Sequence, residues 1–269
     1  MDYISSQEAS KKWGISQRRV ALLCSEGRIR EATMVGKMWL IPRTAEKPVD
    51  GRTIRYEEKS SKCAKPFLKW AGGKGQLLPE IQKYYQFSKN INKYAEPFVG
   101  GGAVLFDILD KFELKEVYIS DVNSDLINAY RCVKDDPERL ITSLKSMEYE
   151  YLIKEVEQRK NYYLKKRETF NQIKIEDNYN HLDKAALLIF LNKTCFNGLY
   201  RVNRKGEFNV PMGAYKNPLI CDENNIRAVS EKLKNVNIVK GDYKKWPMLS
   251  IGMTLLVYSH LLSVFIATF

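Results

Sequence analysis

The stretch that decides the fold is residues 65–102, which begin K-P-F-L-K-W-A-G-G-K (65–74) and end E-P-F-V-G-G-G (96–102). The second motif follows a short apolar segment and precedes apolar residues at helical spacing over 103–109. A strand, a glycine turn and a helix in this order let bare backbone approach a ligand and aim a helix N-terminus at its negative group. Alone the signal is weak, because glycines also occupy ordinary tight turns.

The residues that follow strengthen this interpretation. Residues 116–121 form a short β-rich run that ends on Asp121, and a second helical pattern starts at Asn123. An acid about twenty residues after the glycine turn, at the carboxyl end of the next strand, is placed to bind a ribose hydroxyl. The pattern therefore predicts an α/β fold and a nucleoside-containing cofactor. It leaves NAD and S-adenosylmethionine equally open.

The composition narrows the class of protein. The chain has 269 residues, 44% of them hydrophobic, which suits a globular protein with one large domain or two unequal ones. Its formal net charge of +12 favours an acidic polymer such as nucleic acid as partner. The five cysteines are dispersed and the two histidines lack metal-ligand spacing, so we expect reduced thiols, no metal and a cytoplasmic location. No signal peptide is expected at the N-terminus.

The first fifty residues predict a small separate domain. Ser5 and Glu8 have capping-box spacing at the start of one helix, and a second helix is predicted over 17–26. A short hairpin follows, with residues 38–41 as its return strand. Residues 51–64 carry many charges and little apolar periodicity, so they are predicted to be a linker.

Two short helices and a β-wing resemble a winged helix-turn-helix of the excisionase or MerR-like kind, here over residues 1–50. The resemblance implies that Gln17, Arg18 and Arg19 begin the recognition helix and contact DNA. The alternative is a small helical module that docks on the rest of the chain, with those arginines merely solvated.

Four motifs carry a second resemblance. P-F-L-K-W-A-G-G-K, E-P-F-V-G-G-G, S-D-V-N-S-D-L-I (120–127) and N-G-L-Y-R-V-N-R-K-G-E-F-N-V-P-M-G-A-Y-K-N-P (197–218) occur in the order seen in Dam-type DNA adenine-N6 methyltransferases. The similarity covers about residues 65–243. It implies a Rossmann-like methyltransferase sheet in a domain over 65–246, with a helical DNA-recognition insert at about 135–218. It also implies S-adenosylmethionine as the cofactor.

The resemblance assigns cofactor contacts to two early motifs, to the acid after the second strand and to a later G-D-Y. Taken alone, the tryptophan of the first motif would be a core aromatic and its lysine a solvated charge. The implied cofactor-binding residues are Trp70, Lys74, Phe98, Gly100, Gly102, Asp121, Asp242 and Tyr243.

Within the insert, residues 151–178 have a helical pattern with mixed charges, and residues 182–191 predict a buried helix. Residues 196–218 lose this periodicity and mix aromatics, asparagines, glycines and cations. Such a loop can offer cations to phosphates, a guanidinium fork to guanine and apolar wedges to base steps.

The same resemblance implies roles in this loop. Arg201 matches the arginine that reads guanine, and Phe196 with Asn197 matches the pair at the flipped base. Leu199, Pro211 and Tyr215 match residues that contact the remaining bases. The implied partner is double-stranded DNA containing GATC, in a restriction–modification or mobile-element setting with a possible cognate restriction endonuclease. We expect a monomer without a membrane partner.

The family's D-P-P-Y motif, which holds the flipped adenine, is absent after residue 245, so no catalytic residue is predicted. Residues 247–269 carry no charge. They are either a membrane anchor or the product of a disrupted reading frame, and disruption or truncation is the expectation. We then expect a sheet without its later strands and an inactive, aggregation-prone chain. The alternatives are a non-catalytic DNA-binding or regulatory protein and, less favoured, an NAD-dependent enzyme.

Overall fold

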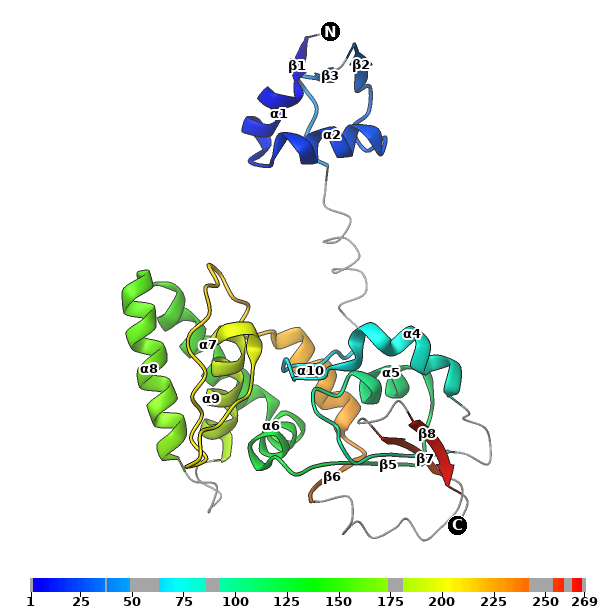
Figure 1. The fold of residues 1–269 in the computed structure, drawn as a ribbon, viewed down its shortest axis with the longest axis vertical. Helices are drawn as coiled ribbons and strands as arrows, with labels where there is room; N and C mark the ends of the chain where they lie inside the picture. Colours follow the sequence, from blue (N-terminus) through cyan, green and yellow to red (C-terminus); the bar gives the residue numbers. More distant parts are fainter. Residues whose placement is uncertain are drawn as a thin grey trace. The chain divides into compact units, whose positions relative to one another are not determined.

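The computed structural model divides into two compact units, Met1–Lys59 and Ser60–Phe269 (Figure 1). Each unit is considered by itself. Backbone and side chains are described for residues 2–36, 38–48, 63–85, 92–173 and 181–241, and the backbone alone for 254–258 and 263–267.

The described residues of the first unit form two helices and a small antiparallel sheet of order β1-β3-β2. Its core is apolar and gathers Ala9, Trp13, Val20 and Ile41 between the helices and the sheet. The predicted helices and the hairpin are confirmed as elements. They are β1 (Tyr3–Ser5), α1 (Ser6–Trp13), α2 (Gln17–Ser25), β2 (Thr33–Val35) and β3 (Met38–Pro42).

Local hydrogen bonds set the helix starts in this unit. The Ser5 hydroxyl accepts a hydrogen bond from the Glu8 amide at 3.2 Å, and the Glu8 carboxylate accepts one from the Ser5 amide at 2.8 Å. This is the predicted capping box, which satisfies two amides that the helix itself leaves unpaired. Gly14, in the left-handed region at φ 64°, ends α1 and turns the chain toward α2.

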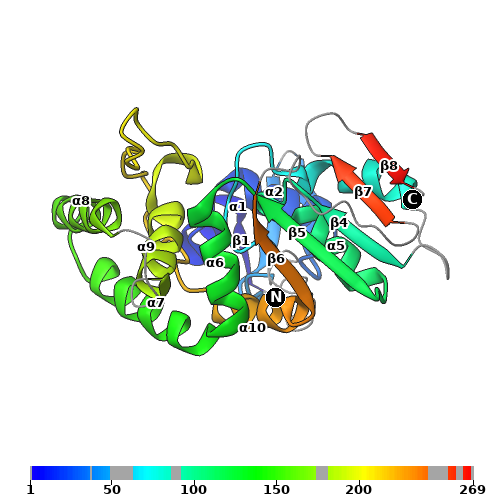
Figure 2. The same cartoon turned by 90° about the horizontal axis from the view of Figure 1, so that it is seen from below.

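The second unit is built on a five-stranded sheet of order β6-β5-β4-β7-β8, in which only β8 runs antiparallel to its neighbour (Figure 2). The first of these strands along the chain, β4, lies inside the sheet, so the strand order reverses beside it. Ligands of open parallel sheets bind at the carboxyl ends of the strands at such a point. The strands are β4 (Lys93–Glu96), β5 (Glu116–Asp121), β6 (Val236–Lys240), β7 (Thr254–Tyr258) and β8 (Ser263–Ala267).

The expectation that the sheet lacks strands after residue 240 is wrong. The strand β7 (Thr254–Tyr258) pairs in parallel with β4, and β8 (Ser263–Ala267) pairs antiparallel with β7. Both segments are rich in β-branched and aromatic residues, which favour extended backbone in a sheet. Among the residues that the structure describes, no helix is long and apolar enough to span a bilayer.

Helices cover the sheet and extend beyond it. Figure 1 shows α4, α5 and α10 along one face, and Figure 2 shows α6, α7, α8 and α9 on the β6 side. They are η1 (Lys74–Leu77), α4 (Leu78–Ile81), η2 (Gln82–Tyr84), α5 (Ala103–Lys111), α6 (Ser124–Asp135), α7 (Pro137–Leu152), α8 (Val156–Gln172), α9 (His181–Thr194), η4 (Phe196–Gly198) and α10 (Glu223–Leu233).

Two insert predictions have different outcomes. The predicted buried helix over 182–191 is confirmed, because α9 is buried along nearly all of its length. The helix predicted from residue 151 instead begins at Val156. Gln158 accepts a hydrogen bond from the Glu155 amide, and this cap sets the start of α8. Residues 174–178 lie outside the described part of the chain.

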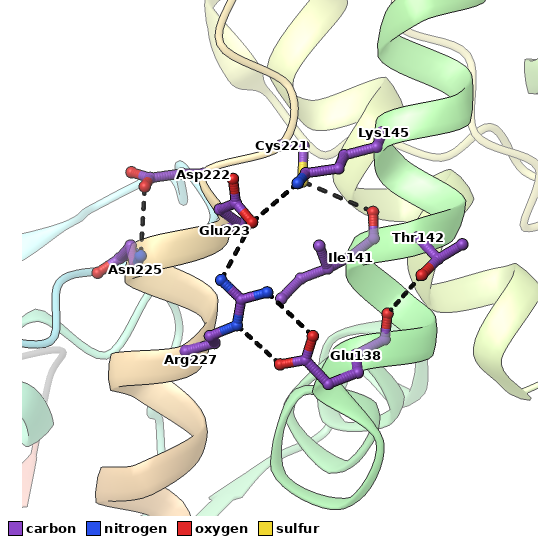
Figure 3. A network of polar contacts seen from close by, with 9 residues as sticks. All are labelled: Glu138, Ile141, Thr142, Lys145, Cys221, Asp222, Glu223, Asn225 and Arg227. Atoms are coloured by element: carbon purple, nitrogen blue, oxygen red, sulfur yellow. Dashed lines mark hydrogen bonds and ion pairs between the residues drawn. The ribbon is translucent and has the colours of Figure 1, made fainter.

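An exposed network of ion pairs joins α7 to α10 (Figure 3). Arg227 donates to Glu138 through Nε at 2.7 Å and Nη2 at 3.0 Å, and to Glu223 through Nη1 at 3.0 Å. Lys145 donates to the same Glu223 oxygen at 2.8 Å. The hydrogen bonds from Arg227 and Lys145 lower the pKa of Glu138 and Glu223 respectively. The network lies where the helical insert returns to the sheet, and exposed ion pairs of this kind contribute little to stability.

Candidate functional site

A pocket of about 220 Å³ lies at the carboxyl ends of β4 and β5, beside the point where the strand order reverses. It is lined by the two glycine-bearing motifs and by the acid that ends β5. The structure therefore brings together residues from three separate stretches of sequence. Of the predicted cofactor residues it gathers Trp70, Lys74, Phe98, Gly100, Gly102 and Asp121.

The glycine turn between β4 and α5 needs its glycines for two reasons. Gly100 and Gly102 lie in the left-handed region, at φ 49° and 76°. A side chain on Gly102 would also collide with the Tyr130 hydroxyl and the Phe106 ring. Tyr130 in turn donates a hydrogen bond to the Gly100 carbonyl at 3.0 Å, which holds the turn against α6. The turn is a rigid backbone cradle that opens into the pocket.

Asp121 is held in place by backbone donors. Its carboxylate accepts hydrogen bonds from the Gly100 amide at 3.3 Å and from the Asn123 amide at 2.9 Å. A carboxylate has about four lone-pair sites, so it retains capacity for two further donors. This arrangement suits a vicinal diol such as that of a ribose.

Glu96, the last residue of β4, also lines the pocket and was not among the predicted site residues. It is 1% exposed and accepts a hydrogen bond from the Tyr94 hydroxyl at 2.7 Å. Burial raises the pKa of Glu96 to about 7, although Tyr94 and the charge of Lys74 act against this. The sequence did carry a signal, since this acid follows the apolar pair Tyr94-Ala95 and stands four residues before Gly100.

Lys74 begins η1 and faces the same pocket. Burial lowers its pKa, and the charge of Glu96 acts in the opposite direction. A cation and an acid at one end of a cavity can together receive a zwitterionic amino-acid group. The Trp70 ring adds an apolar wall. The remaining predicted cofactor residues, Asp242 and Tyr243, lie outside the described residues.

The predicted aperiodic loop forms a hairpin, which we define as residues 195–216. Isolated antiparallel bridges join Cys195 to Met212 and Val202 to Phe208. Between them the Asn209 amide donates to the Arg201 carbonyl at 3.1 Å. The loop thus has two limbs that pair through their backbones without forming a regular strand.

The predicted DNA residues occupy this hairpin and its continuation. Asn197 is exposed with φ 55°, an uncommon conformation that turns the chain between Phe196 and Gly198. Tyr215 is half-buried. The others, Phe196, Leu199, Arg201 and Pro211, are exposed.

Arg201 is positioned by its neighbour across the hairpin. Its Nε donates to Asn209 Oδ1 at 2.7 Å, and its Nη2 donates to the Asn209 carbonyl at 3.2 Å. These bonds use two of the five donors of a guanidinium. The rest are sufficient for a bidentate contact with the O6 and N7 atoms of guanine.

A stripe of polar side chains on α8, which was not predicted from the sequence, holds the return limb of the hairpin. Its members are spaced four residues apart and contact backbone atoms of the hairpin. Tyr163 and Arg167 donate to the Val210 carbonyl at 2.8 and 3.3 Å, and Arg159 donates to the Lys216 carbonyl at 2.7 Å. Asn171 exchanges two hydrogen bonds with Phe208, at 2.8 and 3.1 Å. The four-residue spacing was visible in the sequence, but the acceptors are backbone atoms and leave no signature.

The predicted DNA residues of the first unit lie at the start of α2. Arg18 is exposed and Arg19 is half-buried. Gln17 is exposed as well, but its side-chain amide donates to the Ser6 hydroxyl at 3.2 Å and so ties α2 to α1.

Comparisons with known proteins identify the family of the chain. A sequence model of the D12 class N6 adenine-specific DNA methyltransferases matches residues 70–250. The Type II methyltransferase M.MjaIII of Methanocaldococcus jannaschii is 54% identical over 183 residues, which are 67% of this chain and 63% of the relative. The Type II methyltransferase M1.LlaDCHI of Lactococcus lactis subsp. cremoris is 42% identical over 190 residues, covering 70% and 62% of the two chains.

A DNA adenine methylase of Vibrio cholerae is 33% identical over 182 residues, which are 68% of this chain and 59% of the relative. The chain thus spans about three-fifths of the length of these relatives. The residues that match the family model include Trp70–Lys74 of the first motif, the second glycine motif, Asp121 and the 195–216 hairpin. The chain therefore belongs to the D12 class of N6 adenine-specific DNA methyltransferases.

Proposed function

We propose that the chain binds S-adenosylmethionine in the pocket and duplex DNA on the 195–216 hairpin, as a site-specific adenine-N6 methyltransferase by descent. The observation that carries this proposal is the convergence of Trp70, Lys74, Asp121 and the glycine turn on one cavity at the switch point of the sheet. That cavity and the hairpin are both contained in the stretch that matches the family.

The pocket residues fit each part of this cofactor. Asp121 would accept hydrogen bonds from the ribose hydroxyls, and the glycine turn at Gly100 would let its own backbone approach the ribose closely. Lys74 would bind the cofactor's carboxylate and Glu96 its ammonium group. Trp70 and Phe98 would pack on its apolar parts. When bound, the cofactor supplies an electrophilic methyl group on a sulfonium.

The proposal separates binding from turnover. Methyl transfer to an exocyclic amine requires the flipped base to be held with its nitrogen facing the methyl group. In this family D-P-P-Y does that, and the motif is absent from this sequence. We therefore propose that a polypeptide of this sequence binds cofactor and DNA but turns over poorly or not at all.

The test is isothermal titration of the full chain with S-adenosylmethionine, paired with a methylation assay on a duplex that contains GATC. The expected result is cofactor binding that Asp121→Ala weakens by roughly tenfold or more, with no methyl transfer. Failure to bind the cofactor would overturn the proposal. Methyl transfer would overturn only the part that concerns D-P-P-Y.

We propose GATC as the target and Arg201 as the residue that reads guanine. The preference for GATC over a site in which that guanine is replaced should fall roughly tenfold or more in Arg201→Ala. The reason is that a bidentate arginine–guanine contact contributes about 1–3 kcal/mol. Lys205→Ala, on the exposed turn of the same hairpin, is the matched control. It should weaken binding to all sequences equally.

We also propose that the first unit is a winged helix-turn-helix domain that contacts DNA through Arg18 and Arg19. Its two helices and hairpin, together with the excess of positive charge, support this. If Arg18→Ala abolished sequence preference while Arg201→Ala did not, the second candidate function would be favoured: a non-catalytic DNA-binding protein. The names of two relatives support a restriction–modification setting.

A further inference from the structure

One buried amide joins the cofactor motif to the hairpin. Asn192, on α9, is 2% exposed. Its Oδ1 accepts from the Lys69 amide at 2.8 Å, and its Nδ2 donates to the carbonyls of Lys69 and Gly198 at 2.9 and 2.8 Å. A single side chain thus satisfies the backbone of the residue before Trp70 and the backbone of the hairpin's first turn.

A second contact runs beside the first. The rings of Trp70 and Tyr200 stack, with centroids 5.2 Å apart and an interplanar angle of 26°. Trp70 lines the pocket, while Tyr200 directly precedes Arg201. The Tyr200 hydroxyl donates to Asp125 at 2.8 Å, which anchors the ring to α6.

The two segments also fit closely where they meet. A side chain on Gly198 would overlap the Lys69 side chain, and Gly198 has φ 64°. The Lys69 ammonium lies 5.0 Å from the centre of the Tyr215 ring. Neither segment can shift far without moving the other, because packed side chains have few alternative arrangements.

We propose that Asn192 and Tyr200 are positioning residues that couple the two sites, so that cofactor binding and sequence-specific DNA binding strengthen each other. The inference rests on the proposed function and adds a coupling between its two ligands. A cofactor that packs on Trp70 restricts that ring, and the stack passes the restriction to Tyr200 and hence to the backbone of Arg201. By linkage, DNA that orders the hairpin must raise cofactor affinity by the same factor.

The experiment measures a thermodynamic cycle on the full chain. The dissociation constant of S-adenosylhomocysteine is determined without DNA, with a GATC duplex and with a duplex that lacks GATC. We expect the GATC duplex to tighten binding about fivefold or more in the parent chain, within the usual range of coupling between sites. The duplex without GATC should have little effect.

Two variants break the link by different routes. Asn192→Ala removes three hydrogen bonds, and Tyr200→Leu removes the stack. In each variant, the ratio of the dissociation constant of S-adenosylhomocysteine without DNA to that with the GATC duplex should be close to one. Tyr200→Phe is the matched control, because it keeps the ring and removes only the hydroxyl with its hydrogen bonds, and it should retain most of the coupling. If the residues had a merely structural role, both dissociation constants would rise and their ratio would stay unchanged.

The outcomes are distinct. A parent chain that binds both ligands with a ratio of one overturns the coupling and leaves the proposed function intact. Wild-type coupling in both variants also overturns it. If Asn192→Ala fails to fold, Tyr200→Leu decides alone. A parent chain that does not bind S-adenosylhomocysteine overturns the proposed function and the coupling together.

Discussion

The pocket and the 195–216 hairpin are built in different ways. The pocket is mostly a property of short contiguous motifs, because Gly100, Gly102 and Asp121 shape it through their own backbone conformations and hydrogen bonds. The limbs of the hairpin pair through two isolated bridges and a few further hydrogen bonds, without a regular strand. Its return limb is held by α8, and its first limb by Asn192 and by the Trp70–Tyr200 stack.

The difference teaches where each region is vulnerable. A substitution in the pocket is expected to have a large effect on stability through its immediate surroundings, by straining the backbone or by changing a buried charge. The hairpin depends on side chains from other helices, so its geometry is lost by changes far away in the sequence. Four substitutions test this contrast, from the largest expected effect to the smallest.

The largest effect is expected for Gly102→Ala. The new methyl group would meet Tyr130 and Phe106 at a position with φ 76°, so strain and overpacking add. We expect a loss of about 3–5 kcal/mol in the free energy of unfolding, measured by urea denaturation. Gly206→Ala is the matched control, since it has φ 79° and nothing within 4 Å. It should lose only about 1 kcal/mol, and equal losses would contradict the steric argument.

Glu96→Gln should stabilise the chain at alkaline pH. Because the folded pKa of Glu96 is raised from 4.5 to about 7, the folded state holds its proton more tightly than the unfolded one. The free energy of unfolding therefore falls as the pH rises from 4.5 to 7. We expect the variant to gain up to about 3 kcal/mol at pH 8 and far less at pH 5, in urea titrations.

The same variant should bind S-adenosylmethionine more weakly, since the carboxylate that we propose as the partner of the ammonium group is removed. A gain in stability with a loss of affinity is typical of a binding residue whose burial costs stability while the site is empty. A pH-independent difference between variant and parent would argue against an ionised Glu96 at pH 8.

A moderate effect is expected for Asn171→Ala, which lies on α8 and outside both ligand sites. It removes two hydrogen bonds to the Phe208 backbone, and we expect a loss of about 1–3 kcal/mol in the free energy of unfolding. GATC affinity should fall, while the affinity for S-adenosylhomocysteine without DNA stays unchanged. Glu168→Ala, at an exposed position of the same helix, is the control. A loss of free cofactor affinity in Asn171→Ala would erase the contrast between the two regions.

The smallest effect is expected for Arg227→Met in the α7–α10 network (Figure 3). Its ion pairs are exposed, so solvent and salt screen them. The urea midpoint should shift slightly at low salt, and the shift should disappear at high salt. A large, salt-insensitive shift would show that the insert depends on this network as much as on its apolar core.

Much of this fold was predictable from local patterns. The strand that ends on Asp121, the helix after the glycine turn, the buried helix α9 and the Ser5 capping box were all predicted from the sequence and confirmed. Each depends on residues that are close together in the chain. The start of α8 was not predicted, although it follows a local capping box at Glu155 and Gln158. The two strands of the tail were not predicted, because short apolar runs do not reveal which partners they will find.

The sequence by itself determined the glycine turn, the acid that follows it and therefore the chemical character of the pocket, because backbone conformation and strand periodicity are local properties. The tertiary structure alone decided that β7 lies beside β4, that Glu96 is buried against the pocket, and that α8 and Asn192 hold the hairpin. These depend on burial and on hydrogen bonds to backbone atoms far apart in the chain. Such acceptors are the same in every residue, so no sequence pattern identifies them.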